Sequence, residues 1–242
     1  MTDLFQKHVV ETYGSIAHHF HRTRKAPWPE MRWFTSLIPQ GSRVADIGCG
    51  TGRNSIYIAA QGHMAIGIDI VPDMVSIARK SIIAEGLEEK VNIVVGDARS
   101  LPWDDSSMDG AICVAALHHI PSEEGRSKAL MECWRVIRPG GHLLVSVWAR
   151  EQDRYPSFEI LQDPGDVLVS WKRDIDGAIL KRYYHLYTRS EFEDFVVENI
   201  GCGVVFSHAD NHQLLAVKDA PAPEVPAELG GDNARLSVGR RC

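Results

Sequence analysis

The residues best suited to chemistry form a short acidic and glycine-rich segment, Asp46-Ile47-Gly48-Cys49-Gly50-Thr51-Gly52. The segment ends an apolar run that is typical of a buried strand. Because Gly48, Gly50 and Gly52 carry no Cβ, the backbone can turn sharply there and approach a ligand closely. The segment therefore predicts a ligand-binding turn at the carboxyl end of a strand.

Two further acids end the next two predicted strands. Asp69 ends the second strand, a position that suits a carboxylate accepting the ribose hydroxyls of a bound nucleoside. Asp97 ends the third strand, where a carboxylate can accept from an adenine amino group. Ligands in open α/β sheets bind outside these strand ends. We therefore assign cofactor binding to a set of acids, glycines and their neighbours: Asp46, Gly48, Gly50, Gly52, Asp69, Ile70, Asp97, Ala98 and Ala115.

The charge of Asp46 bears on the identity of the cofactor. A dinucleotide fingerprint uses the same strand–turn–helix geometry, but an acid at Asp46 would repel a pyrophosphate. The acid suits a ligand that carries an ammonium or sulfonium group. The pattern therefore favours S-adenosylmethionine over NAD. A glycine-rich turn without a ligand, with Asp69 and Asp97 as solvated loop acids, is the alternative interpretation.

Alternating apolar runs and amphipathic stretches must position these groups. We expect strands at residues 43–50, 64–70, 91–98, 108–117 and 142–149, and helices at 52–61, 72–86, 123–138 and 188–200. This alternation with short links predicts a parallel, doubly wound sheet. Two later runs joined tightly at Asn211 predict an antiparallel hairpin. The expected fold is α/β and Rossmann-like: a seven-stranded, mostly parallel sheet with a terminal antiparallel strand and helices on both faces.

The remaining segments flank or interrupt this pattern. Residues 1–40 predict a helical cap, broken at Pro27 and Pro29 before a second helix. Residues 41–219 form the expected main domain, in which the stretch 150–187 is an insertion covering the carboxyl edge of the sheet. Residues 220–242 are rich in Pro, Gly and Ala and predict a disordered tail.

Composition indicates a soluble globular protein. Of the 242 residues, 44% are hydrophobic and 24% are charged. The sequence contains no apolar run of about 18 residues, and its start lacks the pattern of a secretory signal. The five cysteines are widely spaced without a CxxC pair, so we expect no metal site or disulfide framework, and a reducing compartment. Cys49, Cys113 and Cys133 are interpreted as small buried side chains.

The net charge of −6 counts against a nucleic-acid partner, because such proteins usually carry a basic surface. The charge is unevenly spread, however. The stretch from His18 to Arg32 holds one acid, Glu30, and a local group of cations: Arg22, Arg24, Lys25 and Arg32. This patch, or a partner protein, could supply the missing affinity.

Several further segments are distinctive in combination: Tyr13–Phe20 (YGSIAHHF), Thr23–Pro29 (TRKAPWP), Val147–Gln152 (VWAREQ), Asp166–Val169 (DVLV) and Arg182–His185 (RYYH). Leu117-His118-His119 and Arg138-Pro139-Gly140-Gly141 accompany them. Over residues 8–218 the chain resembles the Trm9-type tRNA wobble-uridine methyltransferases, a family that includes the methyltransferase domain of the vertebrate AlkB-homologue 8 protein. The specific part of this resemblance is the combination of three segments: Thr23–Pro29, Val147–Gln152 and Arg182–His185.

The resemblance implies a class I methyltransferase fold and methyl esterification of 5-carboxymethyluridine at the tRNA wobble position, with S-adenosylmethionine as cofactor. It also implies the tRNA anticodon loop as partner, a small zinc-binding activator of the Trm112 type, and a cytoplasmic or nuclear location. Two features depart from the family. Thr51 stands where several relatives carry Asn, and residues 153–165 are shorter than in relatives with a long insertion.

The acceptor site is expected to hold orienting donors. A carboxymethyl group with a pKa near ~4 is already ionised at neutral pH and needs no general base, whereas a hydroxyl acceptor would need one. The candidate catalytic residues are His118, His119, Arg24 and Arg182. The candidate substrate-binding residues are Arg24, Lys25, Trp28, Trp148, Tyr184 and His185.

Each of these residues also has a structural interpretation. At a strand end His118 and His119 would point in opposite directions, so at most one is expected to face the substrate. Arg24 can bind a carboxylate or phosphate bidentately, or can be a solvated charge. Trp28 and Trp148 can stack on a splayed base, or can pack in the core.

Two other functions remain open at this point. A small-molecule methyltransferase acting on a quinone or carboxylic acid would share the fold and suit the negative charge. A non-catalytic binding module could also use this scaffold. The segments that carry the family resemblance favour the tRNA enzyme.

Overall fold

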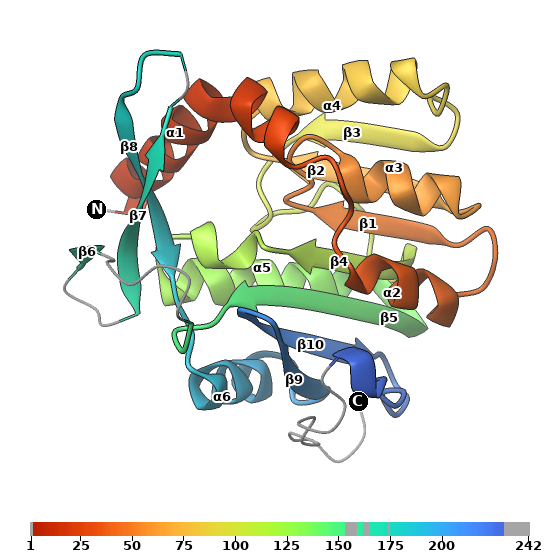
Figure 1. Ribbon diagram of the computed structural model, residues 1–242. Coiled ribbons are helices and arrows are strands. Elements are labelled where there is room, and N and C mark those ends of the chain that lie inside the picture. Colours follow the sequence, from red (N-terminus) through yellow and green to blue (C-terminus); the bar gives the residue numbers. More distant parts are fainter. Residues whose placement is uncertain (1, 153–158, 162–164, 174, 230–242) are drawn as a thin grey trace.

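The protein is built on a seven-stranded sheet between two layers of helices (Figure 1). The computed structural model describes residues 2–152, 159–161, 165–173 and 175–229. The strands of the sheet lie in the order β3-β2-β1-β4-β5-β10-β9. In chain order they are β1 (Arg43–Ile47), β2 (Met64–Asp69), β3 (Val91–Val95), β4 (Met108–Val114), β5 (Ile137–Trp148), β9 (Val204–His208) and β10 (Asn211–Val217).

Strands β1 to β5 run parallel, and β10 runs antiparallel to both of its neighbours, β5 and β9. The predicted mostly parallel α/β sheet is therefore confirmed. The antiparallel strand is last in the chain but lies inside the sheet, with β9 at the edge. The tight turn is Ala209-Asp210 and not Asn211, which is the first residue of β10.

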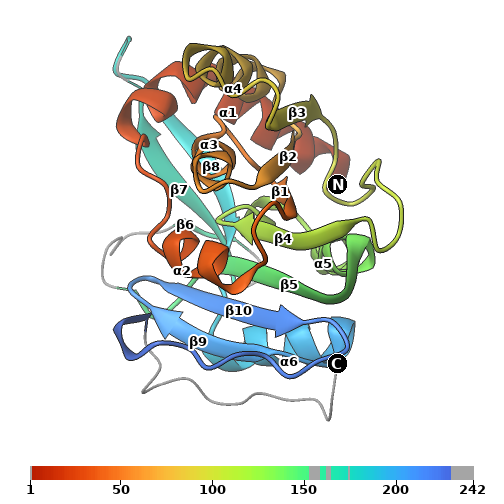
Figure 2. The same cartoon turned by 90° about the vertical axis from the view of Figure 1, so that its right-hand side faces the viewer.

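The helices cover both faces of the sheet, as Figure 2 shows from the side. Helices α2 (Glu30–Leu37), α3 (Arg53–Ala60) and α4 (Pro72–Ala84) contribute to one apolar cluster. Helices α5 (Glu123–Val136) and α6 (Arg189–Ile200) contribute to the cluster on the opposite face. No helix within the described ranges combines the length and apolarity needed to cross a bilayer.

A second, three-stranded antiparallel sheet stands beside the long helix α1 (Thr2–Thr23) in Figure 1. Its strands are β6 (Glu159–Ile160), β7 (Asp166–Lys172) and β8 (Ile179–His185). The apolar side of α1 packs simultaneously on α4 and on this small sheet, through Ile16, Met74 and Tyr183. Residues expected to form the insertion are therefore tied to the amino-terminal helix.

His185 anchors the small sheet to the main domain. Its Nδ1 lies 2.7 Å from Asp166 Oδ1 and its Nε2 lies 2.9 Å from Glu191 Oε1. Tyr183 donates a 2.6 Å hydrogen bond to the same Asp166 oxygen. His185 is 3% exposed. This histidine therefore joins β8 to β7 and α6, and it is not placed to bind a substrate.

The part of the predicted tail that the structure describes packs on the domain. Leu229, in the short 3₁₀ helix η2 (Ala227–Leu229), joins Phe206 and Leu215 in an apolar cluster. Residues 230–242 lie outside the described residues.

The cysteines follow the prediction in part. Cys49, Cys113 and Cys133 are free and buried, as expected. Cys202 is disulfide-bonded, which the wide spacing of the cysteines did not predict.

We expect His185→Gln to reduce the pH dependence of stability. Burial alone would lower the pKa of His185, but hydrogen bonds to Asp166 and Glu191 raise it above its usual value. The charged imidazole therefore stabilises the fold below ~6.5, the pKa of an unperturbed histidine. This contribution is lost as pH rises through the raised folded-state pKa.

Thermal unfolding midpoints measured from about pH 6 to about pH 9 should consequently fall more steeply for the wild type than for the variant. Burial would raise the pKa of Asp166 and of Glu191, but hydrogen bonds from His185 hold both values below their usual range. Both carboxylates therefore stay ionised throughout this pH range, and His185 is the group of the three that changes charge. Parallel curves for the two proteins would show that His185 stays neutral in the fold.

Candidate active site

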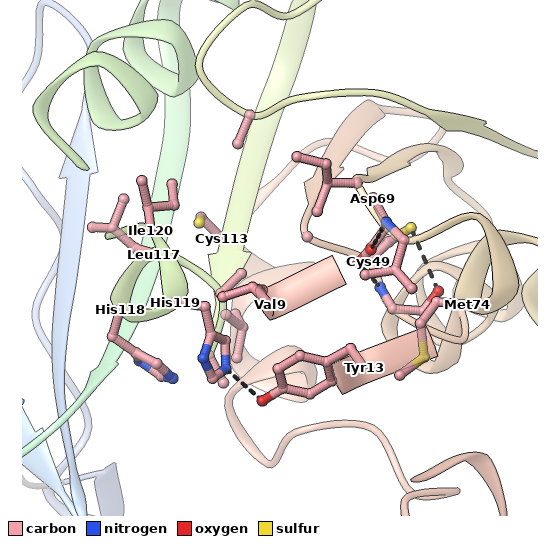
Figure 3. Close-up of a pocket in the computed structure, with 18 of the residues that line it drawn as sticks. Val9, Tyr13, Cys49, Asp69, Met74, Cys113, Leu117, His118, His119 and Ile120 are labelled. Carbon is pink, nitrogen blue, oxygen red and sulfur yellow. Dashed lines mark hydrogen bonds between the residues drawn. The ribbon is translucent and has the colours of Figure 1, made fainter. Parts of the chain in front are cut away.

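A cavity of about 300 Å³ lies where β1 to β5 end, and residues of α1 and β8 also line it. Figure 3 shows part of this lining. In the close-up, His118 and His119 lie on one side, Asp69 and Cys49 lie on the other, and Tyr13 of α1 reaches across between them. The cavity therefore has two halves. The Asp69 half lies at the ends of β1 to β3, and the histidine half lies at the ends of β4 and β5.

The glycine-rich turn after β1 forms the floor of the Asp69 half. The backbone N–H groups of Gly48 and Cys49 donate to Ile68 O at 2.8 and 3.1 Å, which fixes the turn against β2. Gly48 has a φ of +71°, and a Cβ there would lie 2.2 Å from the Cβ of Ala116. A side chain at position 48 would therefore clash with the loop that carries the histidines.

Asp69 organises this turn. Its Oδ2 accepts from Gly50 N at 2.8 Å and its Oδ1 accepts from Val71 N at 2.9 Å. Burial raises the pKa of Asp69 and the two backbone donors oppose this rise. Each carboxylate oxygen keeps a further lone pair, and Asp69 lines the cavity. The side chain can therefore accept both hydroxyls of a ribose.

Asp97 lies farther along the same wall, with Ala98 beside it. The Arg99 guanidinium forms a 2.6 Å ion pair with Asp97 Oδ2, and Gln6 of α1 donates to the same oxygen at 3.1 Å. Burial would raise the pKa of Asp97, but the hydrogen bonds from Arg99 hold it below the usual value. Asp97 is thus an ionised acceptor, and α1 takes part in this end of the site.

Both histidines of the Leu117-His118-His119 segment line the cavity. We expected at most one of them to face the substrate because side chains alternate along a strand, but β4 ends at Val114 and both histidines lie in a 3₁₀ turn, η1 (Leu117–His119). Their ring centres are 4.4 Å apart. The alternation of side chains along a strand therefore does not apply to this pair.

The protonation of His119 follows from its partners. Its Nδ1 lies 3.0 Å from the Tyr183 carbonyl oxygen, which can only accept, so Nδ1 carries the proton. Its Nε2 lies 3.0 Å from the Tyr13 hydroxyl and accepts from it. Burial lowers the pKa of His119 to about 3. The ring is therefore neutral, and its one lone pair is already engaged.

His118 is also neutral. Burial holds its pKa well below the ordinary value, with the nearby His119 and Arg182 adding to the effect. Its Nδ1 accepts from the Trp148 backbone N–H at 3.1 Å, so the proton lies on Nε2. Neither histidine is suited to act as a general base at neutral pH, but His118 presents an N–H donor.

Four arginines line the cavity: Arg24, Arg53, Arg182, and Arg99, which is paired with Asp97. Arg24 and Arg182 both lie against the ring of Trp171, with Cζ atoms 5.3 and 4.7 Å from its centre. Arg53 lies 5.2 Å over Trp28. Burial and the charge of Arg24 lower the pKa of Arg53 to about 10, so it stays cationic at neutral pH. The arrangement favours an anionic ligand group.

Aromatic side chains form the remaining walls. Trp28, Trp148 and Tyr184 all line the cavity, as predicted for a substrate-binding surface. The Trp148 and Tyr184 rings lie 4.5 Å apart, and Tyr184 stacks on His118 at 5.1 Å. The two tryptophans therefore combine packing with exposure to the cavity.

Four of the predicted site residues do not line the cavity: Asp46, Gly52, Lys25 and His185. Asp46 is 1% exposed and accepts from Ser55 Oγ at 2.5 Å, and burial raises its pKa to about 6. Gly52 directly precedes α3, and a Cβ there would lie 3.1 Å from the Cβ of Ala78. Lys25 is exposed. Asp46 and Gly52 thus shape the turn without facing a ligand.

Sequence reasoning also missed residues that line the cavity: Gln6, Tyr13, Arg53, Arg99, Gln152 and Asn211. Arg53 directly follows the glycine segment, and Tyr13 and Gln152 lie in the segments that carry the family resemblance. These positions could have been proposed from the sequence. Gln6 and Asn211 carry no such signal.

The chain matches known methyltransferases in sequence and structure. A protein-family model described as a methyltransferase domain matches residues 45–145. A methyltransferase from Methanosarcina mazei, described as S-adenosylmethionine-dependent, superposes with a TM-score of 0.66 at 24% identity, over 80% of this chain and 98% of that one. The CcbJ methyltransferase of Streptomyces caelestis gives a TM-score of 0.68 at 16% identity, over 84% and 96% of the two chains. At these identities the likeness shows the fold.

Curated relatives narrow the family. The tRNA (carboxymethyluridine(34)-5-O)-methyltransferase ALKBH8 of Mus musculus is 40% identical over 152 residues, which are 62% of this chain and 21% of the relative. The tRNA (carboxymethyluridine(34)-5-O)-methyltransferase of Schizosaccharomyces pombe is 30% identical over 234 residues, 88% of this chain and 97% of the relative. The matches span only 21% and 35% of the mouse and Arabidopsis thaliana proteins.

The fold and the strand-end cavity define a class I S-adenosylmethionine-dependent methyltransferase. Within that class, the chain belongs to the family of the tRNA (carboxymethyluridine(34)-5-O)-methyltransferases.

We expect Asp69→Ala to abolish measurable binding of S-adenosylhomocysteine in calorimetric titration, because the acceptor for the ribose is removed. The same change leaves Gly50 N and Val71 N without their acceptor, so the free energy of unfolding should fall by about 1–3 kcal/mol. Asp73→Ala removes an exposed acid outside the cavity and should bind normally. Unchanged affinity in Asp69→Ala would reject the assignment.

Proposed function

We propose that this chain transfers the methyl group of S-adenosylmethionine to the carboxylate of 5-carboxymethyluridine at the wobble position of tRNA. The observation that carries the proposal is the presence of Arg24, Arg53 and Arg182 in the same cavity lining as two neutral histidines. Such a site can bind and orient an anion, and its two histidines, with their lowered pKa values, are not suited to deprotonate a hydroxyl.

A carboxylate acceptor fits this chemistry. With a pKa near ~4 it is ionised at neutral pH, so the nucleophile arrives ready to react. S-adenosylmethionine supplies an electrophilic methyl group on a sulfonium. As the carboxylate O–CH₃ bond forms, the S–CH₃ bond breaks and the sulfonium charge is neutralised, which gives a methyl ester and S-adenosylhomocysteine. The chain contributes by holding the acceptor in line and excluding water.

Arg182 is the cation suited to hold the acceptor carboxylate. It is 4% exposed, and its charge contributes to the low pKa of both His118 and His119, so it lies close to the histidine half of the cavity. A guanidinium binds a carboxylate through two parallel hydrogen bonds. The Nε2–H of His118 adds a donor on the same side. Arg24 and Arg53 add further positive charge to the cavity lining.

A nucleotide of an anticodon loop suits the aromatic walls. Bases in single-stranded loops can be splayed out and stacked on aromatic side chains. Trp28, Trp148 and Tyr184 offer such surfaces. The Mus musculus and Schizosaccharomyces pombe relatives bear the name of enzymes for carboxymethyluridine 34, which supports the same substrate here.

We further propose that a small zinc-binding activator of the Trm112 type assists the chain, and that both act in the cytoplasm. The family resemblance supports this partner. Co-expression with such an activator should raise the soluble yield or the methylation rate. No change in either would speak against the partner.

The direct test uses an anticodon stem-loop RNA that carries 5-carboxymethyluridine, incubated with the chain and S-adenosylmethionine, alone and with a Trm112-type activator. Mass spectrometry of the digested nucleosides should show the 5-methoxycarbonylmethyl form, and an RNA with unmodified uridine should gain no methyl group. Methylation of small carboxylic acids or quinones in place of the RNA would favour a small-molecule methyltransferase.

We expect the rate of methyl transfer to be nearly flat from about pH 6 to about pH 9. The acceptor carboxylate ionises near ~4 and the pKa of His119 is about 3, so neither group changes charge in this range. Single-turnover rates at saturating RNA and cofactor measure this. A rise in rate with a midpoint between pH 6 and pH 7 would show that a histidine acts as a base.

We expect Arg182→Gln to lower kcat/KM for the RNA by about 100-fold, because a charge-assisted bidentate contact to the acceptor is lost. Affinity for S-adenosylhomocysteine should stay within about threefold. Arg138→Gln, which removes a cation of β5 that pairs with Asp109 outside the cavity, serves as the matched control. Equal losses in the two variants would point to a general effect of charge.

A further inference from the structure

Three buried polar atoms around the end of β5 have no hydrogen-bond partner among the described residues: His118 Nε2, Gln152 Oε1 and Asn211 Oδ1. His118 and Asn211 are 0% and 5% exposed. All three residues line the cavity. A buried polar group without a partner costs about 1–3 kcal/mol, and native proteins seldom leave such groups unsatisfied. Their gathering on one wall indicates a polar ligand.

The backbone holds these three side chains together. Trp148, the last residue of β5, donates its N–H to His118 Nδ1 at 3.1 Å. Across the antiparallel ladder, Asn211 is the direct partner of Trp148, and side chains of such partners lie on the same face of a sheet. Gln152 donates through Nε2 to Ala149 O at 2.6 Å, which leaves its Oε1 as an acceptor.

We propose that Asn211 and Gln152 form a subsite that reads the imide edge of a uracil base. This inference rests on the proposed function, because it concerns the base that carries the acceptor carboxylate. A uracil presents one donor, N3–H, between two acceptors, O2 and O4. An asparagine amide can accept from N3–H and donate to a neighbouring carbonyl at the same time. Gln152 adds a second acceptor for the imide proton.

The rest of the wall fits a planar base. The Trp148 and Tyr184 rings lie 4.5 Å apart beside this subsite and offer apolar faces. Cytosine carries an acceptor in place of the imide N–H, so it would set its N3 lone pair against the amide oxygens. The subsite therefore distinguishes uracil from cytosine, and it leaves the 5-substituent to the arginine and histidine half of the cavity.

If Asn211 had only a structural role, Asn211→Ala would lower the thermal unfolding midpoint, whereas a role in base recognition predicts no such change. A side-chain oxygen without a partner does not hold the fold together, so Asn211→Ala should leave the thermal unfolding midpoint and the affinity for S-adenosylhomocysteine unchanged. Asn199→Ala is the matched control: Asn199 donates to Phe195 O within α6, and it does not line the cavity. This control should change neither RNA methylation nor base preference.

The experiment compares two anticodon stem-loop RNAs, one with 5-carboxymethyluridine and one with its N3-methyl derivative, which lacks the imide proton. The wild-type chain, with its activator where one is needed, should prefer the first RNA by roughly 10- to 100-fold in kcat/KM. In Asn211→Ala the rate on the first RNA should fall and the preference should shrink to about threefold or less. The Asn199→Ala control should keep the full preference.

Two results would overturn the inference. Equal rates of the wild type on the two RNAs, or a preference that survives in Asn211→Ala, would show that the imide edge is not read here, while the proposed function stands. If the wild type methylates neither RNA, the proposed function fails and the uracil subsite fails with it.

Discussion

The site depends on the neutral ring of His119, which makes one hydrogen bond with Tyr13 and another with the Tyr183 carbonyl. These bonds join three segments far apart in the chain: α1, the turn after β4, and β8 of the small sheet. Each segment contributes residues to the cavity. A charged ring would lose its acceptor lone pair and with it the bond from Tyr13, so the low pKa of His119 is part of how the cavity is closed.

Charge is divided across the cavity in a way that the net charge of −6 does not reveal. Asp69 and Asp97 lie on the side of the glycine turn, where a cationic nucleoside suits them. Arg182 of β8 and Arg24, which follows α1, lie on the side proposed for the methyl acceptor. Both guanidinium groups lie against the ring of Trp171. The opposite charges of Asp69 and Arg182 suit a positively charged methyl donor and the proposed negatively charged acceptor, while Arg99 is paired with Asp97. This arrangement is therefore compatible with the RNA substrate proposed for this acidic chain.

The sequence predicted the parts of the structure that depend on local pattern. Apolar runs located the strands of the seven-stranded sheet but not β6, β7 and β8. The strand ends located Asp69, Asp97 and the glycine turn, which line the cavity as expected. Spacing could not tell which way a side chain faces after packing. Asp46 is close to the turn in sequence, but its buried carboxylate accepts a hydrogen bond from Ser55 and does not line the cavity. His185 contacts Glu191 of α6 and does not line the cavity either. Gln6 and Asn211 reach the cavity only through tertiary contacts.

The origin of the cavity residues explains why the fold alone cannot give the substrate. Asp69, Asp97 and the histidines lie within residues 45–145, which match the methyltransferase domain shared with many proteins. Arg24, Arg182 and Asn211 lie outside that range, on the α1–α2 linker, the small sheet and the last hairpin. Structures at 16% and 24% identity share the sheet with TM-scores of 0.68 and 0.66. Because cofactor binding is built into the common sheet, the choice of acceptor is left to segments that can change without disturbing it.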